Sequence, residues 1–83
     1  MPHLDDCQRI LRRLIAEGDP SAIPLAETAI NKYLEVTPQG AHKSGLRLIQ
    51  EDVLAQYSGL VGVQRSFAET VNAYIQKKLA EVP

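Results

Sequence analysis

Apolar residues recur along this chain at intervals of three and four, which is the spacing that places them on one face of a helix. No segment alternates apolar and polar positions for long, and Ala, Leu, Gln and Glu are abundant. Turn-forming residues cluster at 18–20 and 37–40, with a weaker cluster at 58–62. We therefore expect an all-α fold, a three- to four-helix bundle, with residues 1–83 in a single helical domain.

The clearest element is a first helix over about residues 3–17. At 100° per residue its apolar side chains share an arc of about 140°: Leu4, Cys7, Ile10, Leu11, Leu14 and Ile15. The opposite face carries charges at successive i,i+4 spacings, where neighbours of opposite sign can pair: Asp5, Arg9, Arg13 and Glu17. Gly18 follows, and glycine readily adopts the left-handed conformation that closes a helix.

A second short helix is expected over about residues 22–36. Ser21 is the preferred N-cap, because it leaves Pro24 in the first turn, where no backbone donor is lost. The apolar residues cover about half of the helix circumference, which indicates contact with two neighbours. The centres of the apolar arcs along the chain predict the most deeply buried side chains: Leu11, Leu14, Ile30, Leu34, Val53 and Phe67.

Residues 44–81 contain no proline, and apolar residues recur there every seven positions: Leu46, Val53, Leu60, Phe67 and Tyr74. The apolar stripe keeps its direction across Gly59 and Gly62, as it would in a continuous helix. The pattern therefore favours one long, kinked C-terminal helix. The alternative is a break at Ser58–Gly62, which gives two helices and a four-helix antiparallel bundle.

A long helix has consequences for assembly. About 38 residues of helix measure about 57 Å, whereas a compact chain of this length is about 30 Å across. The protruding half would carry an apolar face into water, which a second subunit would have to cover. We therefore expect a homodimer or larger oligomer, with an interaction surface on the C-terminal half: Leu60, Val63, Phe67, Val71 and Tyr74.

The composition of the chain indicates in which cellular environment the protein occurs. Nine Lys and Arg against ten Asp and Glu give a net charge of -1, which argues against a nucleic-acid-coating or membrane-surface protein. The longest apolar runs are far shorter than the about 20 residues of a membrane span. Asp5 and Asp6 lie where a secretory signal would be apolar. The single cysteine, Cys7, excludes an intramolecular disulfide and is typical of a reducing cytoplasm, which is where we place the protein.

Candidate chemistry is sparse. His3 and Cys7 share a helix face, but two ligands do not make a metal site, so we expect Cys7 in the core and neither metal nor cofactor. The basic cluster Arg9, Arg12 and Arg13 could contact phosphates, but neighbouring carboxylates favour a solvated, neutralised face. No metalloprotease, phosphate-loop or nucleophile-elbow motif is present, so we do not expect an enzyme.

The leading hypothesis is a small cytoplasmic interaction module that self-associates and binds another protein as an adaptor, inhibitor or assembly factor. The alternative is a DNA-binding regulator with a degenerate helix-turn-helix near residues 50–70, with Ala55 and Gly59 at the alanine and turn-glycine positions. Ser58 and Arg65 then fall at two core positions of that motif, which weakens it. A minor enzyme or a cofactor-binding oligomer is the third hypothesis.

Overall fold

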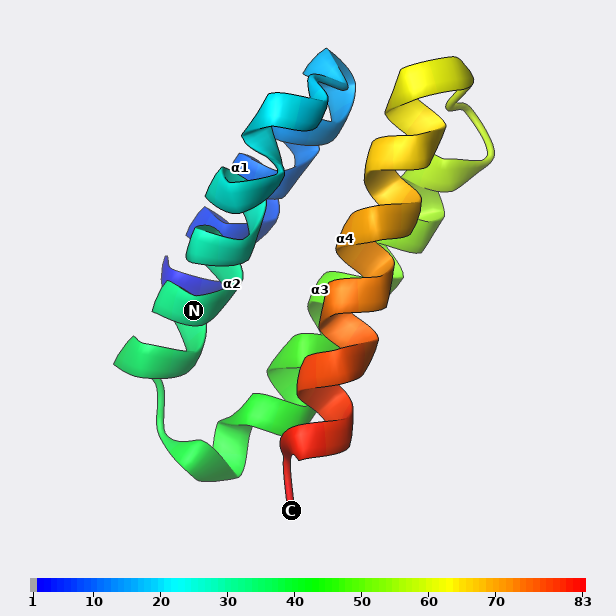
Figure 1. Cartoon of the computed structure of the whole chain (residues 1–83). Helices are drawn as coiled ribbons and strands as arrows, with labels where there is room; N and C mark the ends of the chain where they lie inside the picture. The colour runs from blue at the N-terminus through cyan, green and yellow to red at the C-terminus, as the bar shows by residue number, and fades with distance from the viewer. Residues whose placement is uncertain (1) are drawn as a thin grey trace.

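The computed structural model describes residues 2–83 and shows two helical hairpins that lie side by side (Figure 1). The Cα radius of gyration is 11.9 Å. No β-strand occurs in residues 2–83, so the expected all-α bundle is confirmed. The elements, in chain order, are α1 (Pro2–Glu17), the 3-10 turn η1 (Pro20–Ala22), α2 (Ile23–Val36), the 3-10 turn η2 (Gln39–Ala41), α3 (His42–Tyr57) and α4 (Gly62–Glu81).

The first hairpin, α1–α2, follows the sequence pattern except at its turn. Gly18 has a φ of 65° and its amide donates to the Leu14 carbonyl at 2.9 Å, which closes α1 as expected. The expected N-cap at Ser21 is wrong. The Asp19 carboxylate accepts hydrogen bonds from the Ser21 amide at 3.0 Å and the Ser21 hydroxyl at 2.8 Å, so a 3-10 turn forms before α2. Pro24 does lie in the first turn of α2.

The second hairpin, α3–α4, replaces the long helix that the seven-residue recurrence favoured. The chain reverses direction between Tyr57 and Gly62, so the expectation of a continuous helix is wrong and the hairpin alternative is correct. Gly62 adopts a φ of 59°, which glycine reaches without steric penalty. The reversal lets the apolar faces of both halves pack on the first hairpin, whereas a straight helix would leave one of them in water.

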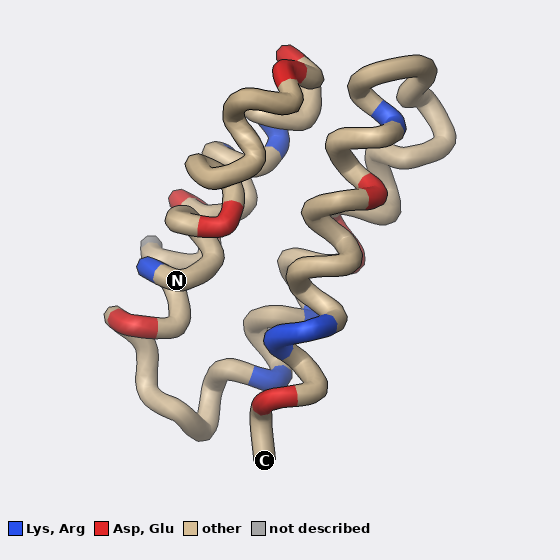
Figure 2. The backbone as a smooth tube through the Cα atoms, viewed as in Figure 1, with Lys and Arg blue, Asp and Glu red and all other residues tan. Residues whose placement is uncertain are grey.

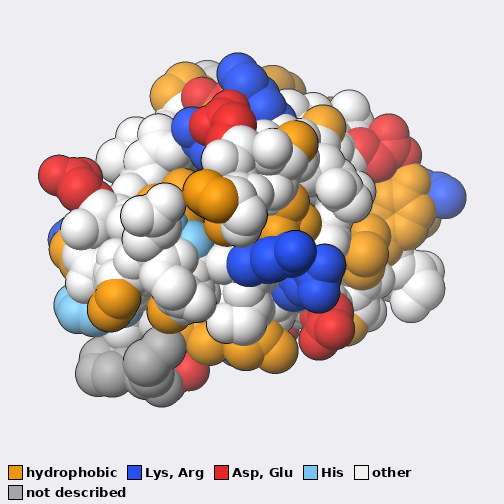
Figure 3. Space-filling model, turned by 90° about the horizontal axis from the view of Figure 1, so that it is seen from below, with side chains coloured by type: hydrophobic (Ala, Val, Ile, Leu, Met, Phe, Trp, Pro, Cys, Tyr) orange, Lys and Arg blue, Asp and Glu red, His pale blue; other side chains and the backbone are white. Residues whose placement is uncertain are grey.

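Charged residues are distributed along both hairpins, with the two signs interspersed (Figure 2). The end view of the bundle likewise shows apolar side chains scattered among charged ones (Figure 3). The guanidinium group of Arg12 on α1 donates hydrogen bonds to both carboxylate oxygens of Asp52 on α3, at 2.8–3.2 Å. Tyr74 of α4 donates to Asn31 of α2 at 2.7 Å. Both contacts are largely exposed, so they orient the two hairpins more than they stabilise them.

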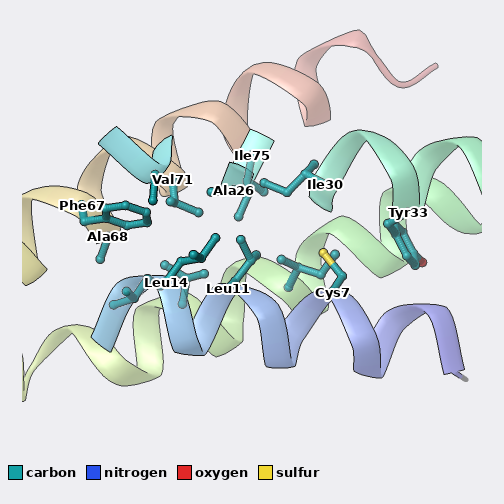
Figure 4. Close-up of a cluster of buried hydrophobic side chains, with 14 of the residues drawn as sticks. Cys7, Leu11, Leu14, Ala26, Ile30, Tyr33, Phe67, Ala68, Val71 and Ile75 are labelled. Carbon is teal, nitrogen blue, oxygen red and sulfur yellow. The ribbon is translucent and has the colours of Figure 1, made fainter. Parts of the chain in front are cut away.

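The core fills the space between the four helices with apolar side chains (Figure 4). Five of the six residues expected to be most buried are 0–8% exposed: Leu11, Leu14, Ile30, Val53 and Phe67. Leu34 is the exception. It is only half-buried, because it lies at the edge of the face of α2 that packs on the core. None of the side chains that the structure describes is both charged and buried.

Candidate interaction surface: the α1–α2 groove

The α3–α4 hairpin buries part of the interaction surface that the sequence predicts on the C-terminal half. Phe67 and Val71 are 3% and 2% exposed and belong to the core of the monomer. Leu60 and Tyr74 are half-buried against that core, and Val63 stays 61% exposed. The reasoning that a second subunit must cover Phe67 and Val71 is therefore wrong, because it depended on a long helix.

The apolar side chains that do stay exposed lie on three parts of the bundle. Leu48 and Leu54 lie on the outside of α3, and Val61 and Val63 lie at the α3–α4 turn. The third part is the outer face of the first hairpin, with Ile10 at 42%, Leu25 at 59% and Val36 at 44% exposure. This third set differs from the others because it borders two adjoining pockets.

The first pocket, of about 300 Å³, lies between the first half of α1 and the second half of α2. We call it the Cys7 pocket; it is lined by His3, Asp6, Cys7, Arg9, Ile10, Ala29, Lys32, Tyr33 and Val36. The second, of about 450 Å³, lies nearer the α1–α2 turn and is lined by Ile10, Arg13, Leu14, Glu17, Leu25, Thr28, Ala29 and Lys32. The pockets share Ile10, Ala29 and Lys32, so together they form one elongated groove, the α1–α2 groove.

Helical spacing explains why the groove exists. On α1, Cys7, Ile10 and Leu14 are separated by three and four residues, and on α2, Leu25 and Ala29 are separated by four, so each set lies along one helix face. These faces continue the apolar arcs that enter the core, but the second hairpin covers only the inner part of each arc. The width of the two arcs is visible in the sequence. Which edge stays uncovered depends on how the hairpins pack, so the groove was not predicted.

Ion pairs along the rim of the groove are weak. Arg9 contacts Asp6 at 2.9 Å, and Arg13 contacts Glu17 at 3.9 Å. All four side chains are more than half exposed, so each pair contributes little and can exchange partners. Lys32 makes no ion pair or hydrogen bond within the described part of the chain. The rim thus offers charges of both signs to an incoming surface.

The basic cluster that could have contacted phosphates is neutralised in the folded protein. Arg12 pairs with Asp52 of α3, and its two neighbours pair with the carboxylates of α1. This agrees with the expectation of a solvated face. The partner of Arg12 could not be anticipated, because it lies 40 residues away in the sequence.

The floor of the Cys7 pocket does not offer reactive groups. Burial raises the pKa of the Cys7 thiol from its ordinary value of 9.0 to about 12, so at neutral pH it is a protonated thiol and a poor nucleophile. Burial also raises the pKa of Tyr33, whose hydroxyl forms no hydrogen bond. Within residues 2–83, no three His, Cys, Asp or Glu side chains lie close enough together to hold a metal ion.

The geometry of α3 and α4 does not match a helix-turn-helix. The two helices run antiparallel and side by side (Figure 1), whereas that motif crosses its helices at about 90–120°. Two side chains near the start of α4, which would be the reading helix of the motif, also have partners within the monomer. The Gln64 side chain donates to the Ala16 carbonyl at 2.6 Å, and Arg65 lies over the Tyr57 ring, 4.6 Å from its centroid.

None of the helices in residues 2–83 combines the length and the apolar character needed to span a bilayer. The chain matches no protein family model, no curated protein and no solved structure.

Proposed function

We propose that this protein is a small helical interaction module that associates with a second copy of itself through the α1–α2 groove. The observation that carries the proposal is the continuity of the groove, which joins two pockets and three exposed large apolar side chains on one face. A groove between two helices is a shape that accepts a helix face of a partner. The free, buried thiol of Cys7 supports a reducing compartment such as the cytoplasm.

The rim charges favour a second copy as the partner. A rim of a single sign would call for a partner of the opposite sign. Here Asp6 and Glu17 lie on the same rim as Arg9, Arg13 and Lys32, so the face can complement itself. Closed pairs in which both copies use the same patch are the commonest form of self-association.

The area of the α1–α2 face determines the affinity that we expect for the dimer. α1 and α2 have 16 and 14 residues, so they are about 24 and 21 Å long, and each is about 10 Å wide. The pair of helices offers roughly 450 Å² per copy, so a dimer would bury roughly 900 Å², below the about 1,200–2,000 Å² of a stable complex. We therefore expect a reversible dimer that dissociates in the micromolar range or above.

Sedimentation velocity over a concentration series from about 10 to 500 μM tests this proposal. The wild-type protein should shift from monomer to dimer as concentration rises. Ile10→Glu places a charge inside the groove and should keep the protein monomeric throughout. Leu54→Glu is the matched control, because Leu54 is 49% exposed, close to the 42% of Ile10, but lies on α3. It should dimerise like the wild type.

Circular dichroism melts of both variants verify that each remains folded. Wild-type protein that stays monomeric over the whole series would refute self-association. An equal loss of dimer in the two variants would show that the groove is not the contact surface.

A further inference from the structure

The two ends of the α1–α2 groove present different features to a partner. Leu25, next to the α1–α2 turn, is 59% exposed, the largest exposed fraction of the three apolar side chains on this face. The opposite end holds the Cys7 pocket, with Cys7 and Tyr33 buried in its floor and Val36 at its edge. One end therefore offers an exposed leucine, and the other offers a pocket floored by buried side chains. Within one molecule they cannot meet, because residues 25 and 36 are about 16 Å apart along α2.

We propose that two copies pair about a two-fold axis that crosses the groove perpendicular to its helices, so that Leu25 of each copy enters the Cys7 pocket of the other. This inference rests on the proposed self-association and specifies its geometry. A rotation about such an axis exchanges the two ends of the groove, so both contacts form at once. Each α2 then runs antiparallel to the α2 of the other copy.

The residues between the two ends are compatible with this arrangement. Ala29 lies between Leu25 and the Cys7 pocket and lines both pockets. Its small side chain allows the two α2 helices to approach where they cross. The same rotation brings Arg13 and Glu17, at the Leu25 end, over Asp6 and Arg9, at the Cys7 end of the other copy. Each end carries one acidic and one basic side chain, so Arg13 can pair with Asp6 and Glu17 with Arg9 of the other copy, twice in the dimer.

The size of the pocket also agrees with a leucine as its occupant. A cavity of about 300 Å³ has the volume of about ten water molecules of the liquid. A single leucine side chain fits, with space left for the partner's backbone to approach. The other two-fold arrangement, with its axis along the helices, places the Leu25 ends of both copies together. It brings no leucine to either Cys7 pocket, so the fit of Leu25 in that pocket favours the antiparallel pairing.

Cysteine crosslinking between two variants tests this geometry. Both carry Cys7→Ala, which removes the native thiol; one also carries Leu25→Cys and the other Val36→Cys. The two are mixed and oxidised with copper–phenanthroline, which accepts the two electrons released as two thiols form a disulfide. A mixture of Leu54→Cys and Val36→Cys in the same background is the control, since Leu54 has a comparable exposure on α3.

The expected result is a covalent dimer on a non-reducing gel, several-fold more abundant in the Leu25→Cys and Val36→Cys mixture than in the control. Efficient crosslinking of Leu25→Cys alone would overturn the proposal, because it would place the Leu25 ends together. If wild type dimerises and Ile10→Glu does not, yet the mixture crosslinks no better than the control, the antiparallel geometry is wrong and the proposed function stands. If wild type never dimerises, both are wrong.

Discussion

Gly45 of α3 occupies a position where a single methyl group should destabilise the bundle. A Cβ built there overlaps the hydroxyl oxygen of Tyr33 from α2 and lies 2.6 Å from the ring carbon Cζ and 2.9 Å from Cε2. Non-bonded carbon atoms prefer separations of about 3.5–4.0 Å. The Tyr33 ring, which is 2% exposed, would therefore have to move by about 1 Å against the surrounding core.

Two opposing effects set the size of this change. Alanine in place of glycine inside a helix normally stabilises by about 1 kcal/mol. Forcing extra volume into a packed core destabilises by about 1–3 kcal/mol, and the overlap at Gly45 is large enough for the upper part of that range. We expect a net loss of about 1–2 kcal/mol, which lowers the melting temperature of a domain of this size by about 4–16 °C.

Thermal and urea denaturation followed by circular dichroism measures the effect. Gly40→Ala is the control, because no atom lies within 4 Å of a Cβ added there, and it should change stability by less than about 0.5 kcal/mol. In a Tyr33→Leu background, which removes the ring, Gly45→Ala should no longer destabilise. Tyr33→Phe alone should be neutral or stabilising, because the lost hydroxyl has no hydrogen-bond partner. A higher melting temperature for Gly45→Ala alone would refute the packing of Tyr33 on α3.

Three further predictions concern other parts of the bundle. Gly62→Ala should lower the free energy of unfolding by about 1–2 kcal/mol in urea titrations, because Gly62 has a positive φ. The control, Gly59→Ala, should change the free energy of unfolding by less than about 0.5 kcal/mol. Equal effects of the two substitutions would contradict the geometry of the turn. Cys7 should react slowly with Ellman's reagent at neutral pH and rapidly in guanidinium. Folding raises the pKa of the Cys7 thiol from 9.0 to about 12, so above pH 9.0 the unfolded state loses this proton first. The free energy of unfolding should therefore fall as the pH increases from 9.0 towards 12. A free energy of unfolding that did not change over this pH range would contradict the burial of Cys7. Leu11→Ala should lower the free energy of unfolding by about 2–5 kcal/mol, and an unchanged melting temperature would show that the buried face of α1 is misassigned.

Local signals in the sequence were sufficient to predict α1. The apolar stripe of α1 and the glycine that follows it depend on residues within one or two turns of each other, so the boundaries of that helix could be predicted closely. The start of α2 was harder, because Asp19 and Ser21 are both good caps. The choice between them depended on a 3-10 turn that the sequence pattern does not indicate.

The seven-residue recurrence predicted a continuous helix where the chain forms a hairpin, and the reason is physical. α3 and α4 face the same core, so Leu46 and Val53 on one helix and Phe67 and Tyr74 on the other point in compatible directions even though the chain has reversed between them. Periodicity records which face is apolar but not the direction of the chain. The deciding feature is the positive φ of Gly62, and a glycine in a sequence permits that conformation without requiring it.

The groove could be predicted only in part. Ile10 falls within the apolar arc of its helix, so the sequence marked it as apolar-facing, and Leu25 and Val36 likewise belong to a wide arc on α2. Whether such a residue is covered depends on how far the second hairpin spreads over the first. That distance is set by side chains on all four helices, beyond the reach of periodicity within one helix.

The contact between Tyr33 and Gly45 also bears on how this chain selects one alignment of its helices. In many bundles a buried polar group fixes the register, because only one alignment satisfies its hydrogen bonds. Here no charged side chain among the described residues is buried, and the buried Tyr33 hydroxyl has no hydrogen-bond partner, so no polar contact in the core fixes the position of α2 along α3. One turn further along α3, however, the Tyr33 ring would meet the buried side chain of Ile49 instead of the space above Gly45. Steric exclusion at Ile49 therefore favours the alignment in which the missing side chain at Gly45 leaves space for the ring.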